Sequence, residues 1–549
     1  MFGRLLASLT LKEKLALRIA GGILTFGLLA GGAQWVRQNT IVVPRAAGTY
    51  TEGFVGQPIN LNPALGGEST IDRDLAALLY SDLATLAATI TPSEGGRIWE
   101  VVLKDDTRWS DGETLSADDV RYTIDTIQDP QTNSPYAQTW RGVVVERTSE
   151  RAIRISLKTP YAFLIDNLRE LRIIPQHIFG NIPTANLRLS SYNLEVVGSG
   201  PYTFTNFEKR KDGFVTAYTM SANSRYSGKM PYIEHIVAKF FAENRELIRA
   251  WSRNEIDGFG GQSNAVIQEL SGNYNTHNVM LPQYYALFEN QSLHQALKNP
   301  VVRKALRATT DRDRIIKKLF DWNATPSYGP IPKNIEGHTE ALYVKEAASS
   351  ESATSMLETD GWKIGNDGVR EKPLGKKMIR LEFEVLVPQI QFLVDTATMI
   401  KEDWAKIGAK LVVVPVAPEE LATNAIKPRN YQLLLFGNTL KNNPDVFEFW
   451  HSSERFYTGA NLALYDNKKV DGLLETIRRT MDITVRAPLI AKLQEIIHDD
   501  APAIFLFSPN YRYIVTSALQ GFKAERLVTP ADRFRFVNEW YIKTKRVFK

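Results

Sequence analysis

The sequence predicts a mixed α/β body made of several lobes, preceded by one membrane-spanning helix. Strand-like alternation and helix-like periodicity are interleaved along most of the chain, which favours an α/β or α+β arrangement. At about 150 residues per domain, a chain of 549 residues is expected to form three or four packed units. A run of 18 uncharged residues near the start is long enough to cross a bilayer once.

The uncharged run, residues 19–36, is expected to be a transmembrane signal-anchor. As a helix it spans roughly 27 Å at about 1.5 Å per residue, close to a hydrocarbon core of about 30 Å. Trp35 stands at one end, and cations precede the run, so residues 1–18 are expected to form a basic tail in the cytoplasm. The rest of the chain is then exported to the periplasm or the cell surface. A cleaved signal peptide is the alternative, because residues 30–33 are small.

The charge distribution gives no sign of a nucleic-acid partner. The net charge is +5, but residues 1–37 carry five cations and one acid, so the remainder holds 61 cations against 60 acids. Nucleic-acid binders usually carry a basic face, and this total gives no such signal. The chain also has no cysteine, which excludes disulfides, thiolate chemistry and a lipoprotein anchor.

Residues 37–47 are expected to form a short linker, and regular elements follow along the body. Strands are expected at 98–103, 152–157, 214–219, 379–385, 410–416 and 431–436. Helices are expected at 117–127, 243–252, 299–308, 311–319, 392–407, 468–480 and 487–497. Asp111-Gly112 predicts a tight turn, and Trp109 before it is expected in the core. Ser116 is expected to cap the following helix, which has acids in its first turn.

Nothing in the sequence indicates an enzyme, a metal site or a cofactor. The seven histidines are scattered, and no HExxH, HxH or Asp-rich calcium loop accompanies them. Paired carboxylates occur without a spacing that implies catalysis. We therefore expect that the chain is not an enzyme and needs no metal or cofactor.

Several segments, taken in order, are characteristic of one protein family. The stretch WSDGETLSADDVRYTIDTI occupies residues 109–127. The others are YTEGFVGQPINLNPAL (50–65), LKTPYAFLIDNLRELRIIPQHIF (157–179), VGSGPYTF (197–204), NPVVRKALRATTDRDRIIKKLF (299–320), KIGAKLVVVPV (406–416), NPDVFEFWHSS (443–453) and GANLALYDNKKVDGLLE (459–475). Across nearly all of residues 48–549 the chain thus resembles the family 5 extracellular solute-binding proteins, the oligopeptide-, dipeptide- and nickel-binding components of ABC importers.

The resemblance implies a three-lobe periplasmic-binding-protein type II fold of the Venus-flytrap kind. Lobe I would be discontinuous and built from residues 48–69, 196–283 and 502–549. Lobe II would comprise residues 70–195 and lobe III residues 284–501. Two lobes are then expected to close on a ligand by hinge motion.

The same resemblance implies the function. We expect a monomeric substrate-binding protein that captures a peptide or peptide-like ligand and presents it to ABC permease subunits in the membrane. The alternative on the same fold is a membrane-tethered sensor or chaperone that is not coupled to import. Neighbouring permease and ATPase genes would favour import.

The ligand-binding residues are expected on two facing segments. In the family's peptide binders an extended strand before an Asn-Pro-Asp-like motif pairs with the peptide main chain. The residues implied here are Glu52, Gly53, Phe54, Tyr285, Phe436, Gly437, Asn438, Thr439, Leu440 and Asp445. Gly437 would allow another backbone to approach closely, and Asp445 also fits a helix cap or first-turn position.

One expected carboxylate is missing from this pattern. The family's peptide binders commonly place an Asp four residues before the proline, where it neutralises the ligand's α-ammonium. Counted from Pro444, that position is Leu440. A buried ammonium without a counter-charge is costly. The site therefore either recruits another acid, such as Glu52 or Asp445, or takes a ligand without a free amine at that point.

Overall fold

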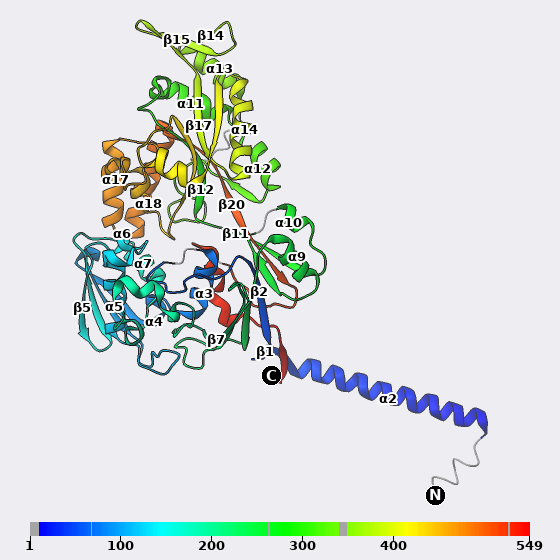
Figure 1. Ribbon diagram of the computed structural model, residues 1–549. Coiled ribbons are helices and arrows are strands. Elements are labelled where there is room, and N and C mark those ends of the chain that lie inside the picture. The colour runs from blue at the N-terminus through cyan, green and yellow to red at the C-terminus, as the bar shows by residue number, and fades with distance from the viewer. Residues whose placement is uncertain (1–9, 67–68, 262–263, 340–347, 525–526) are drawn as a thin grey trace.

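The computed structural model describes residues 10–66, 69–261, 264–339, 348–524 and 527–549. Helix α2 (Leu11–Asn39) projects away from a body of helices packed on β-sheets (Figure 1). Its large apolar side chains are exposed, and contact with the body is confined to its C-terminal end, where Trp35 meets Phe548. The helix is long and apolar enough to cross a membrane, and it extends beyond both ends of the predicted span of residues 19–36.

Within the described residues, the largest sheet has 12 strands. Ten of them follow the order β18 (Lys410–Val416), β17 (Glu382–Pro388), β19 (Leu433–Thr439), β12 (Gln283–Glu289), β20 (Ala503–Thr516), β10 (Gly258–Gly260), β2 (Thr49–Val55), β9 (His235–Phe241), β8 (Val215–Ala222) and β7 (Tyr202–Lys209). Two more, β11 (Tyr274–Met280) and β13 (Ala324–Pro326), pair with β20. The sheet mixes parallel and antiparallel pairs.

Strand β20 divides this sheet into two halves. Its first residues pair with β12, in a register that places Phe507 opposite Tyr285 and Ala503 opposite Phe288. Its last residues pair with β11 and β10, with Val515 opposite Asn275 and Gly258. We name the side with β12, β13, β17, β18 and β19 the distal half, and the side with β2 and β7–β11 the proximal half. In Figure 1 the distal half lies above and the proximal half lies closer to α2.

The distal half is a sheet buried on both faces. Neighbouring residues of β12 point to opposite cores, with Leu287 in one cluster and Tyr284, Ala286 and Phe288 in the other. Strands buried on both faces are expected to be apolar along their whole length, as LLLF in β19 is. One face is covered by α11 (Pro300–Thr309), α12 (Arg312–Phe320), α13 (Ser350–Thr359) and α14 (Gln391–Ala405). The other is covered by α16 (Phe447–Trp450), α17 (Lys468–Arg479) and α18 (Ile483–Asp500).

A separate four-stranded sheet lies beside the proximal half and shares its hydrophobic core. Its order is β3 (Ala87–Ser93), β4 (Ile98–Leu103), β6 (Ala152–Ser156) and β5 (Val144–Ser149). The helices of this region are α3 (Thr70–Leu79), α4 (Leu83–Leu86), α5 (Ala117–Gln128), α6 (Ala137–Trp140), α7 (Leu164–Glu170) and α8 (Gln176–Phe179). The remaining helices are α9 (Asn244–Ser252), α10 (Asn264–Gln268) and α15 (Pro418–Glu420).

Two small sheets complete the described structure. Strands β14 (Lys363–Ile364), β15 (Arg370–Leu374) and β16 (Lys377–Arg380) form a hairpin-like extension at the end farthest from α2 (Figure 1). Strands β1 (Thr40–Pro44) and β21 (Thr544–Phe548) pair at the base of the body. Thus residues 37–47, expected to be a linker, contain the end of α2 and a paired strand. The β-branched run Ile41–Val43 explains that difference.

The predicted local elements agree with the structure with small shifts. All seven predicted helices are present, and Ser116 caps α5 in a reciprocal capping box with Asp119, as its first turn suggested. Trp109 is fully buried. The predicted strand 379–385 is two strands, β16 and β17, which separate at Leu381. Leu381 donates its amide to the Arg370 carbonyl there, so the chain changes partners at that residue.

Candidate functional site

A cavity of about 820 Å³ lies between the four-stranded sheet region and the distal half. Its walls come from segments far apart in the sequence. They are the loop after β2 with α3, the chain from the end of α5 to β5, the α7 segment, the loop from β19 to α16, α17, and the 3-10 helix η9 (Pro530–Glu539). The volume falls within the range of about 300–1,000 Å³ typical of ligand sites.

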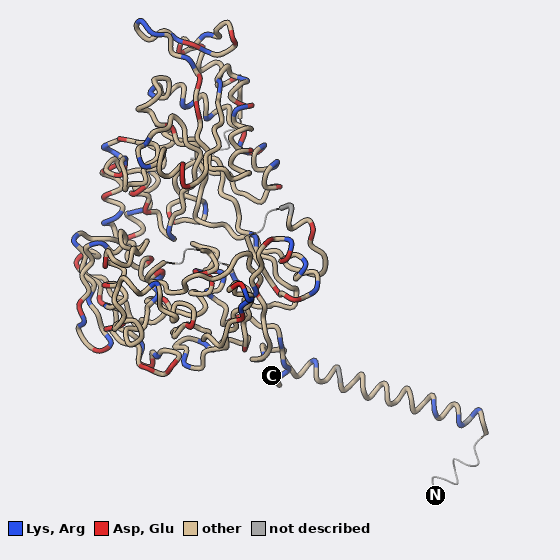
Figure 2. The backbone as a smooth tube through the Cα atoms, in the orientation of Figure 1, with Lys and Arg blue, Asp and Glu red and all other residues tan. Residues whose placement is uncertain are grey.

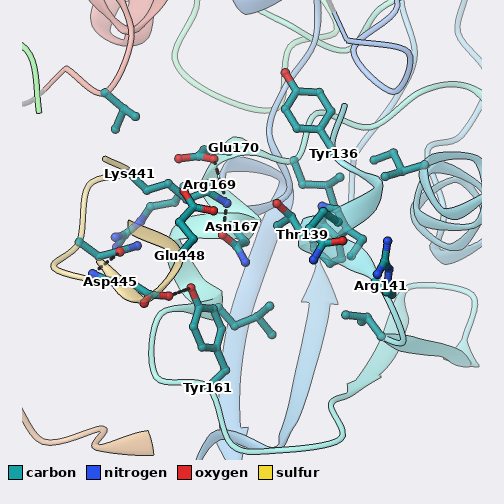
Figure 3. A pocket seen from close by; sticks show the side chains of 18 of the residues that line it. Tyr136, Thr139, Arg141, Tyr161, Asn167, Arg169, Glu170, Lys441, Asp445 and Glu448 are labelled. Carbon is teal, nitrogen blue, oxygen red and sulfur yellow. Dashed lines mark hydrogen bonds and ion pairs between the residues drawn. The ribbon is translucent and has the colours of Figure 1, made fainter. Parts of the chain in front are cut away.

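Hydrogen bonds close one side of the cavity by joining α7 to the loop between β19 and α16. Lys441 Nζ donates to Asn167 Oδ1 at 2.7 Å, and Asn443 Nδ2 donates to Asp166 Oδ2 at 3.1 Å. The Tyr161 hydroxyl donates to Asp445 Oδ2 at 2.8 Å (Figure 3). We call this set of contacts the Asp445 seam. It links two regions that share no strand.

Asp445 is neutralised within the distal half. Arg478 Nε lies 2.9 Å from Oδ1 and 3.0 Å from Oδ2, and the guanidinium stacks on Phe447 at 4.0 Å. The Phe447 amide also donates to Asp445 Oδ1. Asp445 stands one residue before Val446, the N-cap of α16, and Glu448 is the acid in the first turn, so the prediction of a cap or first-turn position for Asp445 is wrong by a residue. Its carboxylate is committed to protein partners.

Two other carboxylates face the cavity at the same end, Glu170 and Glu448 (Figure 3). Surrounding protein raises the pKa of Glu448, and the neighbouring Asp445 charge adds to that rise. Burial also raises the pKa of Glu170, opposed by Lys441, whose Nζ lies 3.7 Å away. Glu448 has no ion pair or hydrogen bond with any described side chain. This end of the cavity thus carries an acid without a full counter-charge.

The opposite end carries unpaired cations. Arg141, beside Tyr136 and Thr139 in Figure 3, makes no ion pair or hydrogen bond through its side chain with the described residues, and neither does Lys158. Lys158 lies next to Arg141 in space, because a β-carbon added to Gly142 would be 3.5 Å from its Nζ. Arg169 and Lys441 also line the end that holds Glu448, so the two ends differ in the sign of the side chains that lack an ion pair.

Of the predicted site residues, Thr439, Leu440 and Asp445 line this cavity. Thr439 exposes its side chain at the end of β19. Leu440 is 2% exposed, and its amide donates to the Pro282 carbonyl at 2.6 Å, so it forms an apolar wall. The other predicted residues lie elsewhere.

The remaining residues of β19 and its neighbour pack within the distal half, which differs from the prediction. Phe436, Gly437 and Asn438 pair with β12, and Asn438 Nδ2 donates to the Tyr284 hydroxyl at 2.9 Å. A β-carbon on Gly437 would be 2.9 Å from the Tyr285 ring, so this glycine makes room for a side chain rather than for a ligand backbone. Tyr285 itself packs against Phe392 and Phe507.

The segment Glu52–Phe54 does not face β19 as predicted. It forms the middle of β2, between β10 and β9. Gly53 lies against Ile256 and Leu247, and Phe54 stacks on Phe240. A strand paired on both edges has no free backbone to offer a ligand.

Glu52 belongs to a buried ion network instead. Arg533 Nη2 lies 2.8 Å from Glu52 Oε1 and 2.8 Å from Asp74 Oδ2, and none of the three is more than 4% exposed. The hydroxyls of Tyr50 and Tyr513 donate to the second Glu52 oxygen. The two acids proposed to replace the missing carboxylate at Leu440, Glu52 and Asp445, are thus both paired to arginines.

Sequence reasoning missed Glu170, Glu448, Arg141 and Lys158. Glu448 follows Pro444 by four residues, but no spacing rule marks it, because its exposure depends on how α7 packs against α16. Among the described residues, no group of three His, Asp or Glu side chains is placed to hold a metal ion.

Replacing Arg533 should destabilise the body strongly. Arg533→Ala leaves two carboxylates buried without a counter-charge, and breaking such a pair typically costs about 3–5 kcal/mol. Denaturant unfolding followed by circular dichroism measures the loss. Arg535→Ala, an exposed arginine in the same 3-10 helix, is the matched control and should change stability by less than about 0.5 kcal/mol. Equal effects of the two variants would contradict this assignment.

Removing one hydroxyl should loosen the Asp445 seam. Tyr161→Phe deletes the hydrogen bond to a charged acceptor, which is worth about 1.5–3 kcal/mol. Because the chain lacks cysteine, one spin-label pair at introduced cysteines can report the distance between α7 and α17. We expect a broader and longer distance distribution than in the parent. Tyr192→Phe, with its ring on Phe179 away from the seam, should leave it unchanged, and an unchanged Tyr161→Phe distribution would refute the seam's role.

Comparisons with known proteins agree with this architecture. Residues 83–457 match the model of the bacterial extracellular solute-binding proteins, family 5. The oligopeptide-binding protein AppA of Bacillus subtilis is 25% identical over 505 residues, covering 87% of this chain and 90% of AppA. The structure of AppA with a nonapeptide superposes with a TM-score of 0.70 at 23% identity, over 91% of this chain and 100% of AppA.

Two further solved structures share the fold. The ABC transporter substrate-binding protein CtaP of Listeria monocytogenes has a TM-score of 0.77 at 22% identity, and NikZ of Campylobacter jejuni, in complex with Ni(L-His), has 0.70 at 23%. Each of the two superpositions covers 91% of this chain and 100% of the compared protein. With a mixed α/β body, a cavity between the four-stranded sheet region and the distal half, and a family match over most of its length, the chain belongs to the family 5 bacterial extracellular solute-binding proteins.

Proposed function

We propose that this protein binds a peptide or peptide-like ligand in the cavity beside the Asp445 seam and delivers it to an ABC-type importer. The observation that carries the proposal is the polarity of the cavity, with Glu448 unpaired at one end and Arg141 and Lys158 unpaired at the other. A free peptide is a zwitterion whose ammonium and carboxylate match these two ends. The relative AppA is an oligopeptide-binding protein by name and was solved with a nonapeptide, which supports this ligand class.

In this proposal Glu448, assisted by Glu170, takes the place of the acid missing at Leu440. Charge-assisted hydrogen bonds from an ammonium to a carboxylate are stronger than neutral ones. Leu440 supplies apolar surface beside that end, and Thr439 offers backbone at the end of β19. Strand β19 pairs with β17 only at Leu433 and Leu434, so the backbone of Thr439, which lines the cavity, has no partner in β17 and would pair with an extended ligand there.

The proposed motion is hinge closure between lobes. Lobe I comprises residues 48–69, 196–283 and 502–549, lobe II residues 70–195 and lobe III residues 284–501. The Asp445 seam would form on closure and break on opening, together with the backbone hydrogen bond from the Ala162 amide to the Arg478 carbonyl, because both join lobes II and III. Two chain crossings, at Leu281–Pro282 and within β20, would act as the hinge. Ligand and seam then stabilise the same closed state.

We also propose that α2 anchors the protein in the cytoplasmic membrane with the body on the extracytoplasmic side, where a monomer meets the permease subunits. The supporting observations are the exposed apolar surface of α2 and the cations Lys12, Lys14 and Arg18 in its N-terminal turns. An anchored receptor stays within reach of its permease without binding it tightly.

Ligand binding should raise the melting temperature of the purified protein. A ligand present at about 100 times its Kd adds about 2.7 kcal/mol to the stability of the folded state. Differential scanning fluorimetry with pools of short peptides, sugar fragments and metal chelates identifies the class, and mass spectrometry of co-purified molecules names the ligand. We expect a shift with peptides. A shift confined to sugars or chelates would reject a peptide ligand while leaving the cavity in place.

Paired variants should separate the two ends of the cavity. Glu448→Gln should weaken binding of free-amine peptides about tenfold or more and leave N-acetylated peptides almost unaffected, since it removes a charged acceptor. Because its pKa is raised, Glu448 loses its charge on acidification sooner than an ordinary glutamate. Affinity for free amines should therefore fall as the pH is lowered towards that raised pKa, and Glu448→Gln should flatten the profile.

Arg141→Ala should show the opposite selectivity, with weaker binding of free-carboxylate peptides and little change for C-amidated ones. Isothermal titration calorimetry measures the affinity of each of the two variants for peptides with a free and with a blocked terminus. Glu234→Gln, an exposed glutamate outside the cavity lining, is the control and should bind every peptide as the parent does. Equal losses for blocked and free peptides would show that neither residue reads the ligand termini.

A further inference from the structure

The junction between α2 and the body is a rigid, paired structure. Strand β1 begins at Thr40, directly after α2 ends at Asn39, and pairs with β21 over five residues from Thr40–Phe548 to Pro44–Thr544. We call residues 37–45 and 543–549 the junction ribbon. The ribbon leaves no unpaired linker between the helix and the strand.

Side chains and backbone tie this ribbon to the last turns of α2. The Lys549 amide donates to the Asn39 carbonyl at 3.0 Å, and Arg546 Nη1 donates to Thr40 Oγ1 at 2.9 Å. The Phe548 ring packs edge-on against Trp35 at 6.0 Å. The helix direction is thereby coupled to the body through two strands rather than one.

The junction ribbon is uniformly basic. It holds Arg37, Arg45, Lys543, Lys545, Arg546 and Lys549, and residues 37–51 and 540–549 contain no Asp or Glu. None of these six cations makes an ion pair with a described acid. In Figure 2 the backbone is coloured for basic residues where α2 meets the body. The exported remainder is otherwise nearly neutral, so the charge is concentrated at this place.

The same ribbon exposes large apolar side chains. Val42 is 55% exposed, Ile41 47% and Phe548 70%, although a two-stranded ribbon on its own is only marginally stable in water. Apolar and basic side chains together, at the end of an apolar helix, are the composition of a segment that lies in the headgroup region of a bilayer. Trp35 adds an aromatic residue at the same level.

We propose that the junction ribbon binds the anionic phospholipid headgroups of the bilayer that α2 enters, and so fixes the orientation of the body on the membrane. The inference rests on the proposed membrane anchoring by α2. Lipid is the occupant that fits, because the ribbon is continuous with the membrane helix and its charge is complementary to an anionic surface. Val42 and Phe548 would then be covered by lipid instead of water.

The test uses the full chain reconstituted into vesicles, with one environment-sensitive fluorophore at Val42→Cys, which is unique because the chain has no cysteine. Leu374→Cys, 59% exposed in β15 at the far end of the body, is the reference position. In vesicles containing equal parts of phosphatidylcholine and phosphatidylglycerol, we expect iodide to quench position 42 at least about threefold less than position 374. This protection should decrease in about 1 M salt, where the screening length is about 3 Å.

Charge-reversal variants provide the matched comparison. Lys543→Glu/Lys545→Glu/Lys549→Glu should lose the protection at position 42, whereas Lys363→Glu/Lys376→Glu/Lys377→Glu, three exposed lysines around the distal hairpin, should retain it. Equal quenching at 42 and 374 in a chain that floats with anionic vesicles would overturn the inference and leave anchoring intact. A chain that does not float with vesicles would reject the anchoring itself. Protection that appears only when a permease is added would assign the ribbon to a protein partner and overturn the lipid assignment.

Discussion

The continuity of strand β20 is the constraint on which the arrangement of the body depends. Its first half belongs to the distal ladder with β12, and its second half to the proximal ladder with β11 and β10. A strand cannot slip by one residue without turning its buried side chains outwards, so both halves hold the register of the same backbone. The two halves therefore share one continuous strand, while the cavity lies where the distal half meets the four-stranded sheet region without a shared strand, through side-chain hydrogen bonds and the backbone hydrogen bond from Ala162 to Arg478.

This arrangement separates two kinds of charged group. Arg533, Glu52 and Asp74 are enclosed, paired with each other and surrounded by aromatic rings, which suits a structural role in tying together β2, α3 and η9. Glu448 and Arg141 have no such partners and face open space. A charge that the protein leaves unpaired at the wall of a cavity is available to a ligand, whereas a charge already paired in a dry core would have to break its own contacts first.

The base of the molecule also depends on a contact between distant segments of the chain. Pairing of β1 with β21 brings residues from near the two ends of the described chain together beside α2. The basic side chains contributed by residues 543–549 gain their position next to α2 only through that pairing. In a receptor that works beside a membrane permease, a fixed tilt of the body would present the same face to the partner in every encounter.

The sequence by itself determined the local elements, the long apolar helix near the start and the family. Periodicity, caps and turn residues act over a few neighbours, so α5 with its Ser116 cap and the apolar strand β19 were predictable. Only the tertiary structure decided which residues meet. Glu52 and Gly437 were predicted to contact the ligand, yet the pairing of β2 with β9 and of β19 with β12 places them inside the protein. Glu448 and Arg141 face one cavity only because α7, α16 and α17 converge there. Such contacts depend on register and packing between distant segments, and neither is encoded in short-range spacing.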